Sequence, residues 1–330
     1  MGFRARKSFK VMPGVRMTVT PRGVSTSVGV RGARVSAHSS GRVTRSVGIP
    51  GSGVSYTTST SGSARATPAA QSRPAAGAKP GFTAPKWEKA LYAAAIVRQD
   101  PAEIRQVATA HAEPRPLAAV LEAMLGAMPA DDDKAARDLL AWAWAQNYDP
   151  GADPFVLKYL PAAGMTLTVA AGITVTMPLS RDAIGLALAE AHQSVGDLAA
   201  AVSVVESLEP STIAAVSLAE LYADQERWDE VITLTDGVTN LDEPSMFMLV
   251  QRAIALRHLG SPGASREALK EALRLRSRPA ELRHLALVER AYTYLAEGKT
   301  GMARRDLDKV LAEDANYPGL SDAIAQLPSD

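Results

Sequence analysis

The sequence predicts a multidomain protein: a small N-terminal all-β domain, a disordered linker, and then a mainly α region with one β-hairpin and an α-solenoid. Three observations predict this organisation. Residues 1–58 alternate β-branched and small polar residues between glycine-rich turns. Residues 59–85 are rich in Ser, Ala, Pro and Gly without apolar periodicity. After residue 85, apolar residues recur at the three- and four-residue spacing of helices.

The N-terminal domain, residues 1–58, is built on an internal repeat. A shift of 19 residues superposes residues 24–36 on residues 43–55 with matching Val, Gly and Ser positions. Valines alternate with Ser, Thr and Arg, so valines fall on one face of each strand, with Arg45 as the exception. A sheet of about 60 residues buries little apolar surface, so we expect the valine face to be covered. The strands are expected at 15–20, 23–29, 33–38, 42–48 and 53–58.

Charge is divided unevenly along the chain. Residues 1–87 contain 14 Lys and Arg residues and no acid, whereas the remaining chain holds 22 basic residues against 35 acidic ones. The two parts therefore carry +14 and −13, although the whole chain carries only +1. Such a division predicts electrostatic partners. The candidate anion contacts are the strand and turn arginines Arg16, Arg22, Arg31, Arg34 and Arg42.

Three interpretations of this basic surface are open. Its charge can keep a small valine-rich sheet soluble. It can also bind a polyanion, such as nucleic-acid phosphates or an anionic envelope surface, because Arg forms paired hydrogen bonds to phosphate. Finally, the short linker holds the basic domain near the chain's own acidic helices. The effective concentration is of order mM, which favours intramolecular docking.

The middle of the chain, residues 86–160, is predicted to be helical. Pro101 and Pro116 suit the first turns of helices, and the acidic run 131–133 suits a helix N-terminus. Residues 161–180 interrupt this pattern with the β-branched stretch MTLTVAAGITVTM, which predicts a hairpin that turns at Ala171 and Gly172.

Residues 181–330 are predicted to form four helix pairs. Small or polar turn residues, Gly196, Glu226, Gly260 and Gly298, separate the two helices of each pair. Together with the pattern around residues 298–318, they resemble the tetratricopeptide repeat over residues 181–327. The resemblance implies an α-solenoid whose concave face binds segments of other proteins.

The N-terminus also resembles a known family. The runs MGFRARKSFK (1–10), PGVR (13–16) and SVGIPGSGVSY (46–56) are similar to a bacterial domain-of-unknown-function family, which is a small basic β domain. The similarity covers nearly all of residues 1–58. It implies no activity.

The residues that carry catalysis or bind metals are sparse. The chain has no cysteine, and none of its five histidines lies three or four residues from another. We therefore expect no metal site, no cofactor and no enzymatic activity. No apolar window approaches a membrane span and no signal peptide is evident, so a cytoplasmic location is expected.

The function that the sequence favours is that of a bacterial scaffold. We expect the solenoid to bind protein partners, with the basic β domain as a second contact. The alternative is a polyanion-binding protein that its acidic repeats regulate. The sequence does not identify the residues that contact the partner.

Overall fold

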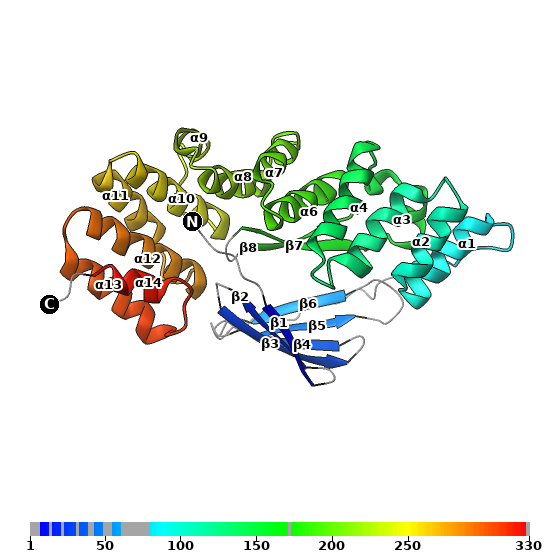
Figure 1. Cartoon of the computed structure of the whole chain (residues 1–330), viewed down its shortest axis with the longest axis horizontal. Helices are drawn as coiled ribbons and strands as arrows, with labels where there is room; N and C mark the ends of the chain where they lie inside the picture. Colours follow the sequence, from blue (N-terminus) through cyan, green and yellow to red (C-terminus); the bar gives the residue numbers. More distant parts are fainter. Residues whose placement is uncertain are drawn as a thin grey trace.

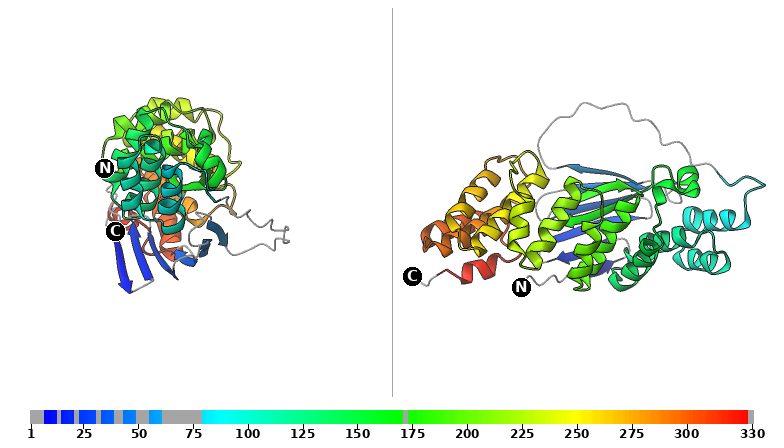
Figure 2. Two further views of the ribbon diagram at one scale, coloured as in Figure 1. Left: turned by 90° about the vertical axis from the view of Figure 1, so that its right-hand side faces the viewer. Right: turned by 90° about the horizontal axis from the view of Figure 1, so that it is seen from above.

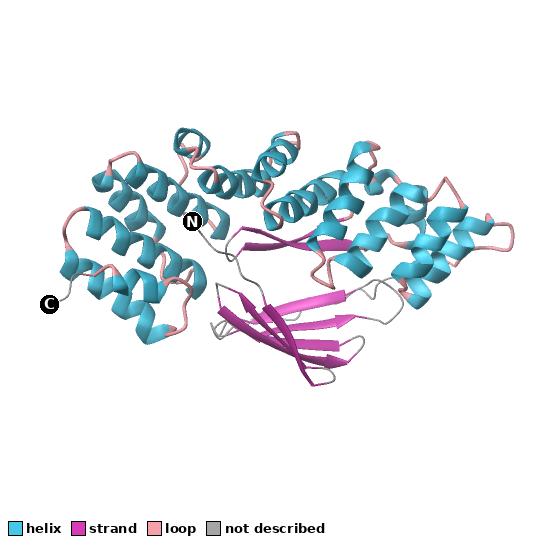
Figure 3. Cartoon of the chain, viewed as in Figure 1, coloured by secondary structure: helices cyan, strands magenta, loops and turns pink. Residues whose placement is uncertain are grey.

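A computed structural model describes the backbone of the strands between residues 7 and 60, and residues 79–170 and 173–327 with their side chains. Helices and two sheets make up these residues (Figures 1 and 3). The strands are β1 (Lys7–Met12), β2 (Val15–Thr20), β3 (Gly23–Val30), β4 (Ala33–His38), β5 (Val43–Gly48), β6 (Ser55–Thr60), β7 (Gly164–Ala170) and β8 (Ile173–Pro178).

The helices follow the first sheet. They are α1 (Lys86–Tyr92), η1 (Ala93–Arg98), α2 (Pro101–Ala110), α3 (Arg115–Glu122), η2 (Ala123–Ala127), α4 (Asp133–Ala145), η3 (Pro150–Ala152), α5 (Pro154–Tyr159), α6 (Arg181–Ser194), α7 (Leu198–Glu206), α8 (Thr212–Asp224), α9 (Trp228–Leu234), α10 (Glu243–His258), α11 (Pro262–Ala272), α12 (Ala280–Ala296), α13 (Thr300–Glu313) and α14 (Leu320–Ala325).

Strands β1–β6 pair in chain order as an antiparallel meander. Five of them coincide closely with the strands expected from the sequence, whereas β1 was not expected. The register places Val28 opposite both Val15 and Val35. It also places Arg45 opposite Val35, which is the one position where the sequence alternation breaks. The side chains of these strands lie outside the described residues.

The predicted helix starts in the middle region are confirmed. Asp100 caps α2, and Pro101 occupies the first turn of that helix. Within the acidic run 131–133, Asp132 caps α4 by accepting a hydrogen bond from the backbone N–H of Ala135 at 3.0 Å. Helices α1 and α3 each continue into a π-helical segment, η1 and η2, which no periodicity in the sequence predicted.

The middle region joins the repeats through a close contact between α4 and α6. A Cβ atom on Gly185 would lie 2.6 Å from a methyl carbon of Leu208 and 3.0 Å from the ring of Trp144. The guanidinium of Arg181 lies over the same ring, 3.8 Å from its centroid. Glycine at position 185 therefore lets α6 approach α4, and we expect any larger residue there to push the two helices apart.

The predicted repeats are present as four helix pairs: α6/α7, α8/α9, α10/α11 and α12/α13. The four predicted turn residues all have the left-handed backbone, with φ of 86° at Gly196, 59° at Glu226, 76° at Gly260 and 72° at Gly298. The helices form an arch, in which α6, α8, α10 and α12 line the inner side and α7, α9, α11 and α13 the outer side (Figure 1). Seen from above, the array is elongated (Figure 2).

One apolar core runs through most of this array. It extends from Leu91 in α1 to Ala286 in α12 and includes the inward residues of β7 and β8. A smaller cluster around Tyr294, Leu307 and Leu320 holds α12, α13 and α14 together. The middle region, the hairpin and the repeats therefore share one core.

Glu226 stands where the other three repeats have glycine, which makes it a site for a stability test. A left-handed backbone costs a residue with a Cβ atom about 1 kcal/mol. We expect Glu226→Gly to raise the free energy of unfolding by about 0.5–1 kcal/mol, because glycine removes this strain. Urea denaturation followed by circular dichroism measures it. The control, Gly260→Ala, should destabilise the protein, since its Cβ atom would meet no neighbour and only the backbone strain would change.

Candidate interaction surface

The hairpin β7–β8 lies on the inner side of the arch, below α6 and α8 (Figure 1). Strand β7 contacts both of these helices. Met165, Leu167 and Val169 of β7 and Ile173 of β8 are buried, at 2%, 1%, 8% and 3% exposure. The hairpin therefore packs its apolar face onto the first two inner helices and covers the surface that the tetratricopeptide resemblance offers to a partner.

The other face of the hairpin is exposed and carries two cross-strand pairs of threonines. Thr166 faces Thr176 with the two hydroxyl oxygens 3.0 Å apart, and Thr168 faces Thr174 at 3.4 Å. All four threonines are exposed. We use the name inner surface for these four threonines together with the inward sides of α10 and α12. Its hairpin part is uncharged, and it presents hydroxyl and methyl groups.

Polar contacts tie consecutive inner helices to one another. The side-chain amide of Gln193 in α6 donates to the carboxylate of Asp224 in α8 at 2.7 Å. Arg257 in α10 donates to the carboxylate of Glu289 in α12 at 2.8 Å and to the backbone carbonyl of Glu289 at 3.1 Å. The Arg257 guanidinium also lies 5.6 Å from the ring centroid of Tyr292. These contacts fix the spacing of the helices that line the inner side.

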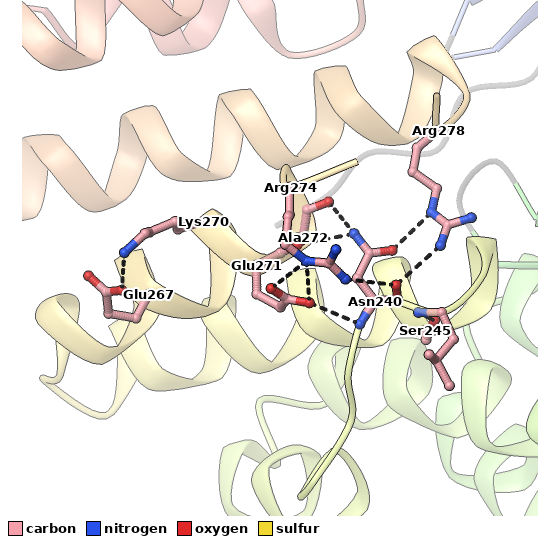
Figure 4. A network of polar contacts seen from close by, with 9 residues as sticks. Asn240, Ser245, Glu267, Lys270, Glu271, Ala272, Arg274 and Arg278 are labelled. Carbon is pink, nitrogen blue, oxygen red and sulfur yellow. Dashed lines mark hydrogen bonds and ion pairs between the residues drawn. The ribbon is translucent and has the colours of Figure 1, made fainter. Parts of the chain in front are cut away.

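A buried asparagine anchors the loop between α9 and α10 (Figure 4). The side-chain amide of Asn240 donates to the backbone carbonyls of Glu271 and Ala272 at 3.0 and 2.8 Å, at the end of α11. Its side-chain oxygen accepts from Arg278 at 2.9 Å. Asn240 is only 1% exposed. It therefore provides partners for helix-end carbonyls that would otherwise be buried without one, which is a structural role.

A carboxylate at the end of α13 ties together the two helices of the last pair, α12 and α13. Glu313 accepts hydrogen bonds from Arg283 at 2.9 Å and shares one with the Nε2 of His284 at 3.0 Å. His284 is buried and its ring meets the edge of the Tyr317 ring, with centroids 5.4 Å apart. The hydrogen bond from His284, aided by Arg283, holds the pKa of Glu313 below its ordinary value.

This lowered pKa predicts a loss of stability in acid. Because folding lowers the pKa of Glu313, the contact stabilises the fold fully above pH 4.5, the ordinary value, and loses that contribution as the pH falls through the lowered pKa. We expect Glu313→Gln to melt below the parent protein at pH 7, and the gap to narrow below pH 4. Thermal melts between pH 7 and pH 3 measure this. A gap that is the same at every pH would contradict it.

The structure describes two of the five candidate anion contacts at backbone level. Arg16 lies opposite Ser27, and Arg34 lies opposite Ser46, in the register of the first sheet. Arg22, Arg31 and Arg42 lie outside the described residues. The proposal that these arginines share a basic face therefore stays a prediction.

The hairpin surface could have been found in the sequence, because MTLTVAAGITVTM alternates threonine with larger apolar residues. Its packing against α6 and α8 could not, since that contact is tertiary. Among residues 79–170 and 173–327, no group of three or more His, Asp or Glu side chains could hold a metal ion. In that same part of the chain, no helix has the length and apolar character needed to cross a bilayer.

Comparison with known proteins agrees with the resemblance seen at the N-terminus. Residues 3–57 match the family described as "Protein of unknown function (DUF4236)". None of the curated proteins is similar to this chain in sequence.

Two solved structures show a partial likeness to this chain. The N-terminal domain of the EccA1 ATPase from the ESX-1 secretion system of Mycobacterium tuberculosis is 16% identical, with a TM-score of 0.49 over 68% of this chain and 81% of that one. A tetratricopeptide-repeat protein of the thermophile Thermus thermophilus is 15% identical, with a TM-score of 0.41 over 64% of this chain and 98% of that one. Similarity at this level transfers neither activity nor partner.

Proposed function

We propose that this protein is a non-enzymatic scaffold that binds a segment of a partner protein on its inner surface. The observation that supports this most is the hairpin. It turns a threonine face of Thr166, Thr168, Thr174 and Thr176 toward the inside of the arch while its other face is buried in the core. Stacked helix pairs serve widely as extended binding surfaces, and the cores of protein interfaces are depleted in charged residues.

Co-purification of the tagged full-length protein from its native host tests this proposal. Thr168→Arg places a charge on the threonine face, whereas Ser203→Arg places the same charge on an exposed position of α7, on the outer side. The partner should be lost with Thr168→Arg and kept with Ser203→Arg. A partner that both variants retain equally would contradict binding at the inner surface.

The charge division favours a second candidate function. Residues 1–87 carry +14 and the rest of the chain −13, so the N-terminal part has a strong attraction for any polyanion. In this alternative the chain binds nucleic acid or an anionic surface through Arg16, Arg22, Arg31, Arg34 and Arg42, and its acidic helices compete for the same arginines by intramolecular docking.

Retention of the full chain on DNA and on anionic vesicles tests the alternative. Binding through arginine–phosphate contacts falls steeply with salt, so retention at low salt should be lost at high salt. The double variant Arg16→Ser with Arg34→Ser should be retained less strongly than the parent protein at low salt. Retention that is absent at low salt would rule the alternative out. The cytoplasmic location remains a prediction, which fractionation of the native host tests.

A further inference from the structure

We infer that a second binding site, separate from the inner surface, lies between α2, α3 and α4, and that it takes an acidic protein segment with an apolar or aromatic anchor. The site is a pocket of about 350 Å³. Helix α2 contributes Arg105, α3 contributes Arg115 and Glu122, and α4 contributes Trp142. We call it the α2–α4 pocket. The pocket lies on α2, α3 and α4, whereas the threonine face lies on β7 and β8, so this inference can be tested independently of the proposed function.

The first argument is an exposed tryptophan. Trp142 is 43% exposed, although other residues of α4, such as Leu140 and Ala143, are fully buried. Trp144, two residues along on the same helix, is partly buried beneath Arg181. Trp144 therefore packs at the α4–α6 contact, whereas Trp142 lines the pocket. Tryptophan and arginine together are the residue types that contribute most to binding at protein interfaces.

The second argument is the charge balance inside the pocket. Glu122 is buried, with 7% of its side chain exposed, and Arg105 donates to its carboxylate at 2.8 Å. The charge of Glu122 is therefore already matched. The Nε of Arg115 donates to the backbone carbonyl of Ala108 at 2.9 Å, which ties the start of α3 to the end of α2. Within the described part of the chain, no carboxylate pairs with Arg115.

These two arguments define the ligand. One guanidinium without a carboxylate partner matches one carboxylate, and the largely apolar walls, Ala108, Ala119 and Leu139 with Trp142, match one apolar or aromatic side chain. A nucleotide fits less well. Its phosphates carry more charge than a single free guanidinium neutralises. A short protein segment with a carboxylate next to an aromatic residue satisfies both features.

Fluorescence anisotropy of labelled heptapeptides on the full-length protein tests this inference. The probes are GSDFDSG, which carries both features, GSKFKSG, which reverses the charge, and GSDSDSG, which lacks the aromatic anchor. We expect GSDFDSG to bind about tenfold or more tightly than either of the others, because each of them loses one of the two matched contacts. Equal affinity for all three peptides would overturn the inference.

Substitutions locate the binding on the protein. Arg115→Gln should lower the affinity for GSDFDSG by about fivefold, which is the upper end of what an exposed ion pair contributes. Trp142→Ala should weaken it by about tenfold or more. The matched control Arg137→Gln changes an α4 arginine that pairs with Asp138 and does not line the pocket, so its affinity should equal that of the parent. Unchanged melting curves check that all three variants fold.

Two further outcomes decide against the site. If ADP displaces GSDFDSG at lower concentration than unlabelled peptide does, the pocket is a nucleotide site and the inference is wrong. If the three variants bind GSDFDSG equally well, the peptide binds elsewhere and the inference is wrong as well. The inference is supported if Arg115→Gln and Trp142→Ala weaken the binding of GSDFDSG and Arg137→Gln does not.

Discussion

Replacing Arg290 by methionine should lower the free energy of unfolding by about 3–5 kcal/mol, because it leaves a buried carboxylate without its main partner. Asp306 in α13 is only 2% exposed. The guanidinium of Arg290 in α12 forms a bidentate pair with the Asp306 carboxylate. Its Nε donates to Oδ2 at 2.7 Å, and a terminal nitrogen donates to Oδ1 at 2.9 Å. Lys309 adds a contact at 2.8 Å from an exposed position. The pair therefore holds the two helices of the last repeat together.

Urea denaturation followed by circular dichroism measures this effect. The double variant Arg290→Met with Asp306→Leu should recover most of the lost stability, because it removes the buried charge together with its partner. An exposed control, Lys270→Met, removes a surface pair with Glu267 and should change the free energy of unfolding by less than about 1 kcal/mol. An Arg290→Met variant as stable as this control would show that the buried pair contributes little.

Leu167→Ala should be the second severe substitution. We expect it to lower the free energy of unfolding by about 2–5 kcal/mol, because it removes a fully buried side chain from the shared core. Leu167 lies in β7, is 1% exposed and belongs to the core that also contains α6 and α8. A cavity there loosens the hairpin from the inner helices, so we expect weaker amide protection in both strands as well as a lower midpoint in urea.

The matched control for this prediction is the neighbouring residue. Thr168→Ala changes an exposed side chain on the opposite face of the same strand, and its effect should stay within about 0.5 kcal/mol. If Leu167→Ala and Thr168→Ala have the same small effect, then the hairpin does not depend on packing against the helices, and the threonine face has no fixed place on the inner side.

Much of the helical architecture could be predicted from the sequence, because its signals are local. The turn residues Gly196, Glu226, Gly260 and Gly298 lie where a left-handed backbone is required, and Asp132 and Pro101 mark helix starts. The hairpin followed from the alternation of threonine with apolar residues in 165–177. Each of these features depends on residues that are close together in the chain.

Contacts between distant segments could not be predicted in this way. Nothing near Asn240 in the sequence indicates that its side chain caps the end of α11, 31 and 32 residues away. Likewise, the separation of Trp142 from the core depends on how α2, α3 and α4 pack, and a tryptophan on an amphipathic helix is more often buried than exposed. The π-helical segments η1 and η2 have no sequence signal in this chain.

The central claim is that the chain acts by binding a protein segment on the inner side of its arch. Hydrogen–deuterium exchange of the full-length protein, alone and with the partner that co-purifies with it, tests this most directly. The account predicts that the partner slows exchange in β7, β8, α10 and α12 and leaves α7, α9, α11 and α13 unchanged. Protection confined to the outer helices or to residues 1–60 would contradict it.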